Sequence, residues 1–361
     1  MSQRLPRDLH PVAWWVWALG LAAAASQTFN PFILLTLVGV ATVVVMARRS
    51  DQPWAHSFRL YVILGLVIVV MRVLFRVILG GGDETTGHVV MDLPEVPLPG
   101  WVLGIRLFGP VTQEALLAGL YDGLRLATIV ICVGAANSLA NPKRLLRSVP
   151  AALHEVGTAL VVAVTMLPQF ADSARRVRRA QSLRAGDTRR IGRLRRYLVP
   201  VLEDALERSL RLAAGMDTRG YGRSAGATVR ERWLTGALML AGLCGICVGV
   251  YAGLDHSAPR VLATPMLVLG VVVAVIGLVG AGRRVPRTSY RPDTWHPAEF
   301  VVMASGITSA VAMWWVVGHQ VLVAYPPLTS WPSLSAAALT AATVGLVAAP
   351  VAPEPRLVMA A

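Results

Sequence analysis

Several apolar stretches of about 20 residues constrain this chain more than any other feature of its sequence, because each can cross a bilayer as a helix. Only helices and closed barrels satisfy every backbone hydrogen bond within the hydrocarbon core. We therefore expect an all-α polytopic membrane protein with about eight transmembrane helices. Their approximate ranges are 12–28, 31–47, 60–80, 113–137, 233–254, 261–282, 299–323 and 331–350.

The distribution of basic residues predicts the orientation of these spans. Of the 34 Lys and Arg residues, 29 lie in segments 1–11, 48–59, 138–232, 283–298 and the C-terminal tail, whereas only Arg106 and Arg260 lie in the loops on the opposite side. Basic residues accumulate on the cytoplasmic side of membrane proteins. We therefore expect a multi-pass protein of the cell (plasma) membrane, with both termini and residues 138–232 cytoplasmic. The proline-rich opposite loop, 81–112, is expected to be extended or hairpin-like.

Four charged residues fall within the predicted spans. Asp122 and Arg125 lie three residues apart, and Arg72 and Arg76 lie one helical turn apart. Because a charge in the bilayer is costly, each such residue needs a partner or a function. We expect Asp122 to neutralise one of the three arginines. A proton or ion path through these groups is the alternative.

The chain is expected to have three parts: a membrane bundle of about four spans at 1–137, a cytoplasmic helical insert at 138–232, and a second bundle of about four spans at 233–361. Residues 172–232 hold sixteen Arg and seven acidic residues. A membrane-adjacent cytoplasmic segment explains this charge, and no nucleic-acid motif accompanies it, so nucleic acid is not an expected partner. Segment 157–171 is short for a span and has basic flanks, which favours an interfacial or bundle-buried helix on the inner side.

Two helices are predicted in the insert. The first covers 172–184 and stops at Ala185-Gly186. A basic turn leads to the second, which begins near Pro200 and carries the i,i+4 ion pairs Asp204–Arg208 and Glu207–Arg211 opposite an apolar face that includes Leu202 and Leu206. Each helix ends with an arginine beside small residues, and a guanidinium fork suits a carboxylate or backbone carbonyl on a partner. The alternative is a solvated cation at a helix end.

These helix ends have the sequences Ala180-Gln181-Ser182-Leu183-Arg184-Ala185-Gly186 and Gly215-Met216-Asp217-Thr218-Arg219-Gly220-Tyr221-Gly222. They resemble the two Ala-Arg-Gly motifs of the transmembrane component of energy-coupling factor (ECF) transporters, the EcfT/CbiQ family. Leu183 and Ala185 replace the Ala and Gly of the first motif, and Thr218 replaces the Ala of the second. Asn141-Pro142-Lys143-Arg144-Leu145-Leu146 is similar to the family's entry into the coupling region, and the resemblance extends over roughly 60–225.

The resemblance implies a non-enzymatic coupling subunit that docks on two ABC-type ATPases and holds a small substrate-binding membrane subunit, the S component. Arg184 and Arg219, with Ala180, Ala185, Gly186 and Gly220 beside them, would contact the ATPases. The chain has no phosphate-binding loop, so Mg-ATP is expected on the partner subunits and no cofactor in this chain. The resemblance is compatible with uptake of cobalt, nickel or one of several vitamins.

Two other function classes stay open. A self-sufficient secondary transporter would use Asp122 and the membrane arginines, and should show related halves, which the sequence does not. A membrane-embedded transferase would need a carboxylate cluster at an inner face. The histidines are scattered, and Cys244 and Cys247 lie inside an apolar run where we expect buried, unpaired thiols. No metal site is therefore expected in this chain.

Overall fold

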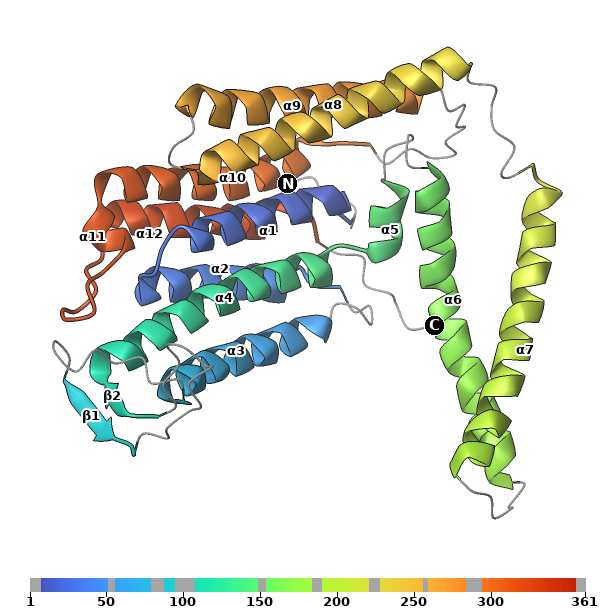
Figure 1. The fold of residues 1–361 in the computed structure, drawn as a ribbon, viewed down its shortest axis with the longest axis horizontal. Coiled ribbons are helices and arrows are strands. Elements are labelled where there is room, and N and C mark those ends of the chain that lie inside the picture. Colours follow the sequence, from blue (N-terminus) through green and yellow to red (C-terminus); the bar gives the residue numbers. More distant parts are fainter. Residues whose placement is uncertain are drawn as a thin grey trace, which may run out of the picture. The chain divides into compact units, whose positions relative to one another are not determined.

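The computed structural model describes residues 8–50, 56–78, 88–94, 108–148, 154–183, 190–220, 228–255, 259–283 and 294–354. In these ranges the chain is helical apart from two short strands (Figure 1). Seven of the described helices are long and apolar enough to cross a membrane. The prediction of an all-α polytopic membrane protein is therefore confirmed.

The seven helices differ in part from the eight predicted spans. Five predicted spans correspond to the apolar helices that begin at Pro31, Phe58, Gln113, Val229 and Pro297, and a sixth to 263–282. The first and last predicted spans appear as shorter apolar helices, Pro11–Ser26 and Ala336–Val351. The seventh long helix contains 156–180, where the sequence predicted a short interfacial or buried helix.

The chain divides into two compact units, which differ from the three predicted parts. Unit 1 comprises residues 1–145 and 293–361, and unit 2 comprises 146–292. The predicted C-terminal bundle, 233–361, is thus shared between the two units. Unit 1 contains α1 (Pro11–Ser26), α2 (Pro31–Arg48), α3 (Phe58–Ile78), β1 (Val89–Asp92), β2 (Pro110–Thr112), α4 (Gln113–Leu139), α10 (Pro297–His319), α11 (Val321–Ala324), α12 (Ala336–Thr343), a 3₁₀ turn (Val344–Val347) and α13 (Ala348–Val351). Unit 2 contains α6 (His154–Leu183), α7 (Arg190–Asp217), α8 (Val229–Leu254) and α9 (Arg260–Arg283), while α5 (Pro142–Arg147) spans the boundary.

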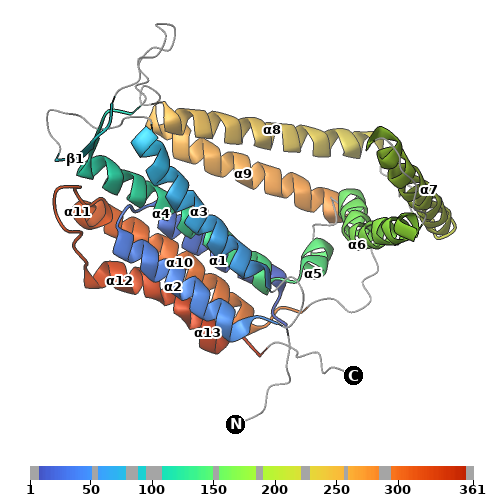
Figure 2. The same ribbon diagram turned by 90° about the horizontal axis from the view of Figure 1, so that it is seen from below.

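The core of unit 1 joins the first two helices of the chain to its last helices (Figures 1 and 2). Trp17 of α1 is fully buried, and its indole N–H donates to the carbonyl oxygen of Gly345 at 3.0 Å. Asn30 caps α2 and donates to the carbonyls of Val323 and Ser333, both at 2.8 Å. These bonds satisfy buried polar groups that would otherwise be costly. Residues 294–354 therefore complete the fold of the N-terminal helices.

Glycines bring neighbouring helices of unit 1 into backbone contact. A Cβ added at Gly20 of α1 would lie 2.3 Å from the carbonyl oxygen of Gly306 in α10. A Cβ added at Gly119 of α4 would lie 2.9 Å from Cγ of Arg76 in α3. Small residues allow such close approach in membrane helices, where dispersion contacts supply much of the association energy. Beside α3 and α4, strands β1 and β2 pair antiparallel, which confirms the predicted hairpin-like loop for its described residues.

In unit 2 the helices of the predicted insert are longer than expected. Helix α6 is continuous through Pro168, so segment 157–171 and the polar stretch after it form one helix. Only 11% of its apolar window is buried, so the bundle-buried alternative is not supported. Helix α7 begins at Arg190, and the predicted basic turn thus contributes its first turns, with Pro200 inside the helix rather than near its start.

Helices α8 and α9 also approach closely. A Cβ added at Gly249 would lie 2.5 Å from the backbone nitrogen of Leu267, and one at Gly242 would lie 2.6 Å from that of Ala274. Cys244 and Cys247 are unpaired, as expected, but they are exposed on α8 rather than buried in this chain. This pair of helices thus presents much apolar surface outward, as a lipid-facing hairpin does.

Candidate functional site

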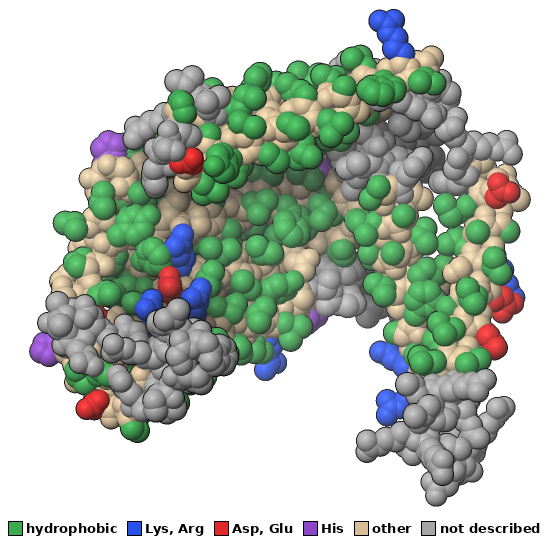
Figure 3. All heavy atoms as spheres, viewed as in Figure 1, with side chains coloured by type: hydrophobic (Ala, Val, Ile, Leu, Met, Phe, Trp, Pro, Cys, Tyr) green, Lys and Arg blue, Asp and Glu red, His purple; other side chains and the backbone are tan. Residues whose placement is uncertain are grey.

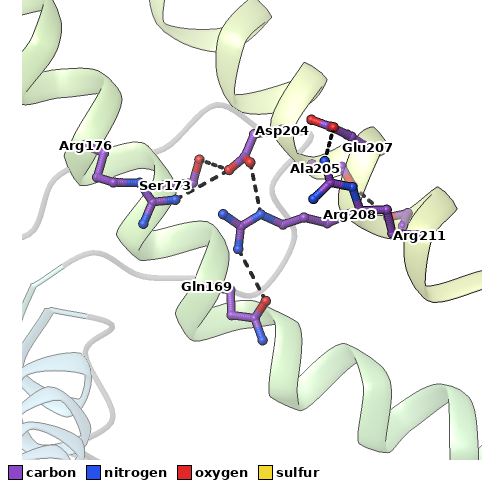
Figure 4. A network of polar contacts seen from close by, with 9 residues as sticks. Gln169, Ser173, Arg176, Asp204, Ala205, Glu207, Arg208 and Arg211 are labelled. Carbon is purple, nitrogen blue, oxygen red and sulfur yellow. Dashed lines mark hydrogen bonds and ion pairs between the residues drawn. The ribbon is translucent and has the colours of Figure 1, made fainter. Parts of the chain in front are cut away.

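A network of polar side chains joins α6 to α7 (Figure 4). The carboxylate of Asp204 accepts a hydrogen bond from the hydroxyl of Ser173 and one from Nε of Arg208 at 3.0 Å. Nη2 of Arg176 lies 3.6 Å from the same carboxylate, and Nη1 of Arg208 donates to Oε1 of Gln169 at 3.4 Å. Three side chains of α6 thus hold two of α7, so the relative position of the two helices depends on these five residues.

These contacts also set the charge of Asp204. The hydrogen bonds from Ser173 and Arg208 hold the pKa of Asp204 below its ordinary value of 3.8, and the positive charges of Arg208 and Arg176 act in the same direction. Hydrogen bonds to the ionised form of a carboxyl group favour that form. Asp204 is therefore an anion at neutral pH, and the network is a bridge between opposite charges.

The sequence predicted only the part of this network that lies within one helix. The i,i+4 pairs Asp204–Arg208 and Glu207–Arg211 are both present, so this prediction is confirmed. Gln169, Ser173 and Arg176 were not identified. Their spacing of four and three residues places them on one face of α6. A polar face at helical spacing inside a helix with an apolar first half is the signal that could have revealed them.

The polar face of α7 is divided between α6 and the outside of the protein. Asp204 and Arg208 contact α6 and are only 32% exposed, whereas Glu207 and Arg211 stay exposed. The apolar stripe is exposed as well: Leu202 is 56% exposed and Leu206 64%. Such a stripe, which Leu198 and Leu210 extend, is a surface for another apolar body, since single exposed apolar residues are common but aligned ones are not.

The C-terminus of α7 exposes Arg219. The helix ends at Asp217, and the amides of Arg219 and Gly220 donate to the carbonyls of Met216 and Asp217 at 3.1 and 2.9 Å. Gly220 has φ +75°, a left-handed conformation that glycine adopts without steric cost. Within the described part of the chain, the guanidinium of Arg219 makes no ion pair or hydrogen bond, and the side chain is exposed. It is therefore available to a partner.

Most of the other predicted helix end lies outside the described residues. Arg184, Ala185 and Gly186 belong to that part, and their predicted role stays a prediction. Ala180 is described and is exposed near the end of α6. The exposure of a small residue there allows close approach by another chain.

The predicted membrane charges belong to α3 and α4 of unit 1. Figure 3 shows a small group of basic and acidic side chains within an otherwise apolar surface. Asp122 and Arg76 line the same pocket. The predicted direct ion pair is not confirmed, because in the described ranges no Lys or Arg nitrogen lies within 4.0 Å of Asp122. Arg125 instead donates to the carbonyl oxygen of Ser26, and its guanidinium lies 4.5 Å from the ring centroid of Phe29. Ser26 ends α1, where unpaired carbonyls and the helix dipole attract a cation.

The geometry therefore offers two amphipathic helices joined by a polar network, an exposed leucine stripe and an exposed arginine just after a helix end. None of these groups is arranged as a nucleophile with a base, and in the described residues no three His, Cys, Asp or Glu side chains are placed to hold a metal ion.

Comparison with known proteins gives two matches. Residues 2–229 match the model of a family described as CbiQ, cobalt transport protein. The chain is also 26% identical over 199 residues to the energy-coupling factor transporter transmembrane protein EcfT of Leuconostoc gelidum subsp. gasicomitatum, and this alignment covers 50% of the chain and 67% of that relative. The family match includes α1 to α7 and ends as α8 begins.

Proposed function

The chain belongs to the CbiQ cobalt transport protein family, a family of transporter membrane components, and from this we propose that it is the transmembrane coupling subunit of an ATP-driven ECF importer. In this role α6 and α7 would contact two ABC-type ATPase subunits that bind Mg-ATP. Their movement would pass through the two helices to a substrate-binding membrane subunit. The chain itself would catalyse no reaction.

The observation that carries the proposal is the end of α7. Arg219 is exposed and makes no ion pair or hydrogen bond through its guanidinium in the described residues, and the left-handed Gly220 follows it directly. Because the family match includes this helix end, the surface belongs to the part of the chain that relatives share. A planar guanidinium can form two parallel hydrogen bonds with a carboxylate or with carbonyls of an ATPase.

The network between α6 and α7 supports the transmission step. A coupling element must move as a rigid body, because bending between its helices would absorb a displacement applied to one of them. Asp204 receives contacts from Ser173 and Arg176 of α6 and from Arg208 of its own helix, so displacement of α7 would be transmitted to α6. The exposed stripe containing Leu202 and Leu206 provides an apolar surface for the membrane subunit.

We further propose that the protein lies in the cell membrane with both termini and residues 138–232 in the cytoplasm, where ATP is available. The cargo is a vitamin or a transition-metal ion such as cobalt or nickel. Specificity for the cargo would reside in the substrate-binding subunit, because the described residues of this chain include no candidate metal cluster.

The test is co-purification of the wild-type complex and of variants, together with substrate uptake and ATPase activity. Truncating one partner of a desolvated charged contact costs about 2–5 kcal/mol, equivalent to roughly 30-fold to several-thousand-fold in affinity. Arg184→Ala combined with Arg219→Ala should therefore lose the ATPases or uncouple hydrolysis from uptake while the protein still folds. Arg219→Lys should rescue poorly, because a point charge lacks the fork.

Arg211→Ala is the matched control. Arg211 is 75% exposed on the same helix and pairs only within that helix, so its loss should change little. Arg208 is unsuitable as a control because it also contacts α6. Wild-type uptake and ATPase recovery in the double arginine variant would refute the docking role. Uptake by the purified chain without any ATPase would instead support the secondary-transporter alternative.

A further inference from the structure

A pocket of about 210 Å³ lies at the end of unit 1 opposite the connection from α4 to α5. Phe29, which follows α1, and Tyr325, which follows α11, form part of its wall, with ring centroids 5.7 Å apart. Arg76 of α3 contributes another part, and Tyr121 and Asp122 of α4 complete the polar lining. The proposed coupling mechanism uses none of these residues.

The pocket lining holds one arginine and one carboxylate, and two more arginines lie beside residues that line the pocket or flank Asp122. Arg125 lies over the ring of Phe29, and Arg72 packs its Cβ beside Gly123, next to Asp122 in α4. With Arg76, three arginines and one carboxylate thus lie in this part of unit 1. In the described residues, Arg72 and Arg76 make no hydrogen bond or ion pair. An uncompensated cation near the hydrocarbon core is costly, so an anion bound here would stabilise the protein.

The surroundings indicate which anion is available. The pocket lies near the C-terminal ends of α1 and α3 and the segment after α10, and it includes residues from the first ten of α4. Tyrosines are enriched at the membrane–water interface, and both Tyr121 and Tyr325 line the pocket. At that depth the phosphate of the phospholipid headgroup is the commonest anion, and arginine binds phosphate oxygens with good geometry.

We propose that this pocket binds the phosphodiester group of an anionic phospholipid. Arg76 contacts the phosphate from the pocket wall and Arg72 from the rim, while Arg125 holds Phe29 in place. Asp122 limits the negative charge that the bound group can carry. A singly charged phosphodiester can bind between the arginines, whereas the carboxylate of Asp122 repels a doubly charged phosphate monoester. The lipid thus neutralises the charge that no described acidic group neutralises.

The test is native mass spectrometry of the full chain in mild detergent, titrated separately with phosphatidylglycerol, phosphatidylethanolamine, diacylglycerol and inorganic phosphate. We expect phosphatidylglycerol to bind most tightly and diacylglycerol, which lacks the phosphate, at least tenfold more weakly. Inorganic phosphate at millimolar concentration should not compete. Equal binding of diacylglycerol, or preferential binding of inorganic phosphate, would overturn the assignment to a lipid headgroup.

Two substitutions with opposite expected effects on phosphatidylglycerol affinity test whether the lipid binds in this pocket. Arg76→Gln keeps the part of the side chain that packs on Gly119 and should weaken phosphatidylglycerol binding about tenfold. Asp122→Asn removes the repelling charge and should strengthen it. Arg59→Gln is the control, since Arg59 is exposed near the other end of α3 and should leave affinity unchanged. Equal effects of Arg76→Gln and Arg59→Gln on phosphatidylglycerol affinity would refute the proposal. Weaker phosphatidylglycerol binding by Asp122→Asn would also refute it, so the test stands even if one variant folds poorly. Loss of a co-purified membrane subunit from Arg76→Gln without any change in lipid affinity would assign the pocket to a protein carboxylate instead.

Discussion

Replacing Gly20 by alanine should destabilise unit 1, because at this residue the backbones of α1 and α10 are in close contact. The added Cβ would lie 2.3 Å from the carbonyl oxygen of Gly306 and 2.4 Å from its carbonyl carbon. Both atoms belong to the backbone, so no side-chain rotation relieves the clash. Ordinary carbon contacts begin near 3.4 Å, and the two helices must therefore separate by about 1 Å.

The energetic cost has two parts. Overpacking a tight interface typically costs about 1–3 kcal/mol. A gap of 0.5–1 Å around the new contact forfeits about a quarter to a half of each dispersion well at the interface. For a domain of about 150–250 residues, 1 kcal/mol corresponds to roughly 2–4 °C in the unfolding midpoint. Gly20→Ala should thus lower the midpoint of unit 1 by about 2–12 °C.

The chain contains its own reporter and its own control. Cys132 lies in the core of unit 1 with no exposed surface, so after Cys244 and Cys247 are replaced by serine, a thiol-reactive fluorescent dye reports unfolding of this unit. Gly39→Ala in α2 is the matched control, because its added Cβ meets nothing within 4 Å. That variant should keep or raise the midpoint, since glycine is less favourable than alanine within a helix. A midpoint for Gly20→Ala equal to that of Gly39→Ala would refute the packing argument.

Three further predictions concern orientation and charge. Single cysteines placed at Ser224 and Thr86 in a cysteine-free background should be labelled from opposite sides of the membrane, and labelling of both from outside intact cells would refute the predicted topology. Because the folded-state pKa of Asp204 is lowered, its carboxylate stabilises the α6–α7 pairing above the ordinary value of 3.8 and loses this effect as the pH falls through the folded-state value. The distance between spin labels on the two helices should therefore increase in acid, and an identical acid transition in Asp204→Asn would exclude Asp204 as its cause. Asp122→Asn should destabilise unit 1 by less than the roughly 3–5 kcal/mol expected when a buried ion pair is broken, because no arginine nitrogen lies within 4.0 Å of the carboxylate in the described ranges. A destabilisation of the full roughly 3–5 kcal/mol, relieved by neutralising Arg72 or Arg76, would restore the ion-pair hypothesis.

Much of the helical architecture could be predicted because local patterns determine it. The predicted span at 113–137 corresponds to α4, Gln113–Leu139, where Thr112 caps the N-terminus. Proline was less informative within helices. Pro168 and Pro200 both lie inside continuous helices, although a proline removes one backbone donor. A proline lowers the stability of a helix at its own position, and the helix-forming residues on either side determine whether the helix continues.

The tertiary contacts could not be predicted in the same way. Trp17 and Gly345 form a hydrogen bond across 328 residues of sequence, and no periodic pattern connects them. Arg125 illustrates the same limit at the candidate sites. Its spacing suggested Asp122 as a partner, but its guanidinium contacts the carbonyl of Ser26 and the ring of Phe29, two groups that the fold places within reach. For Arg219, by contrast, the predicted helix end, exposure and glycine cap could all be inferred locally.

The packing of residues 294–354 on α1 and α2 has a consequence for how the protein is made. When the ribosome has synthesised α1 to α4, the surface of α1 around Gly20 and Trp17 still lacks its covering helices. Residues 146–292 must be synthesised before α10 emerges, a delay of roughly 10–30 s at typical elongation rates. During that interval an incomplete bundle stays in the membrane, and the surface of α1 that will contact α10 is exposed to lipid or to insertion factors. A ribosome that stalls after α7 would therefore leave a chain with α6 and α7 complete but the bundle of unit 1 unfinished, which is a substrate for quality-control proteases in the membrane.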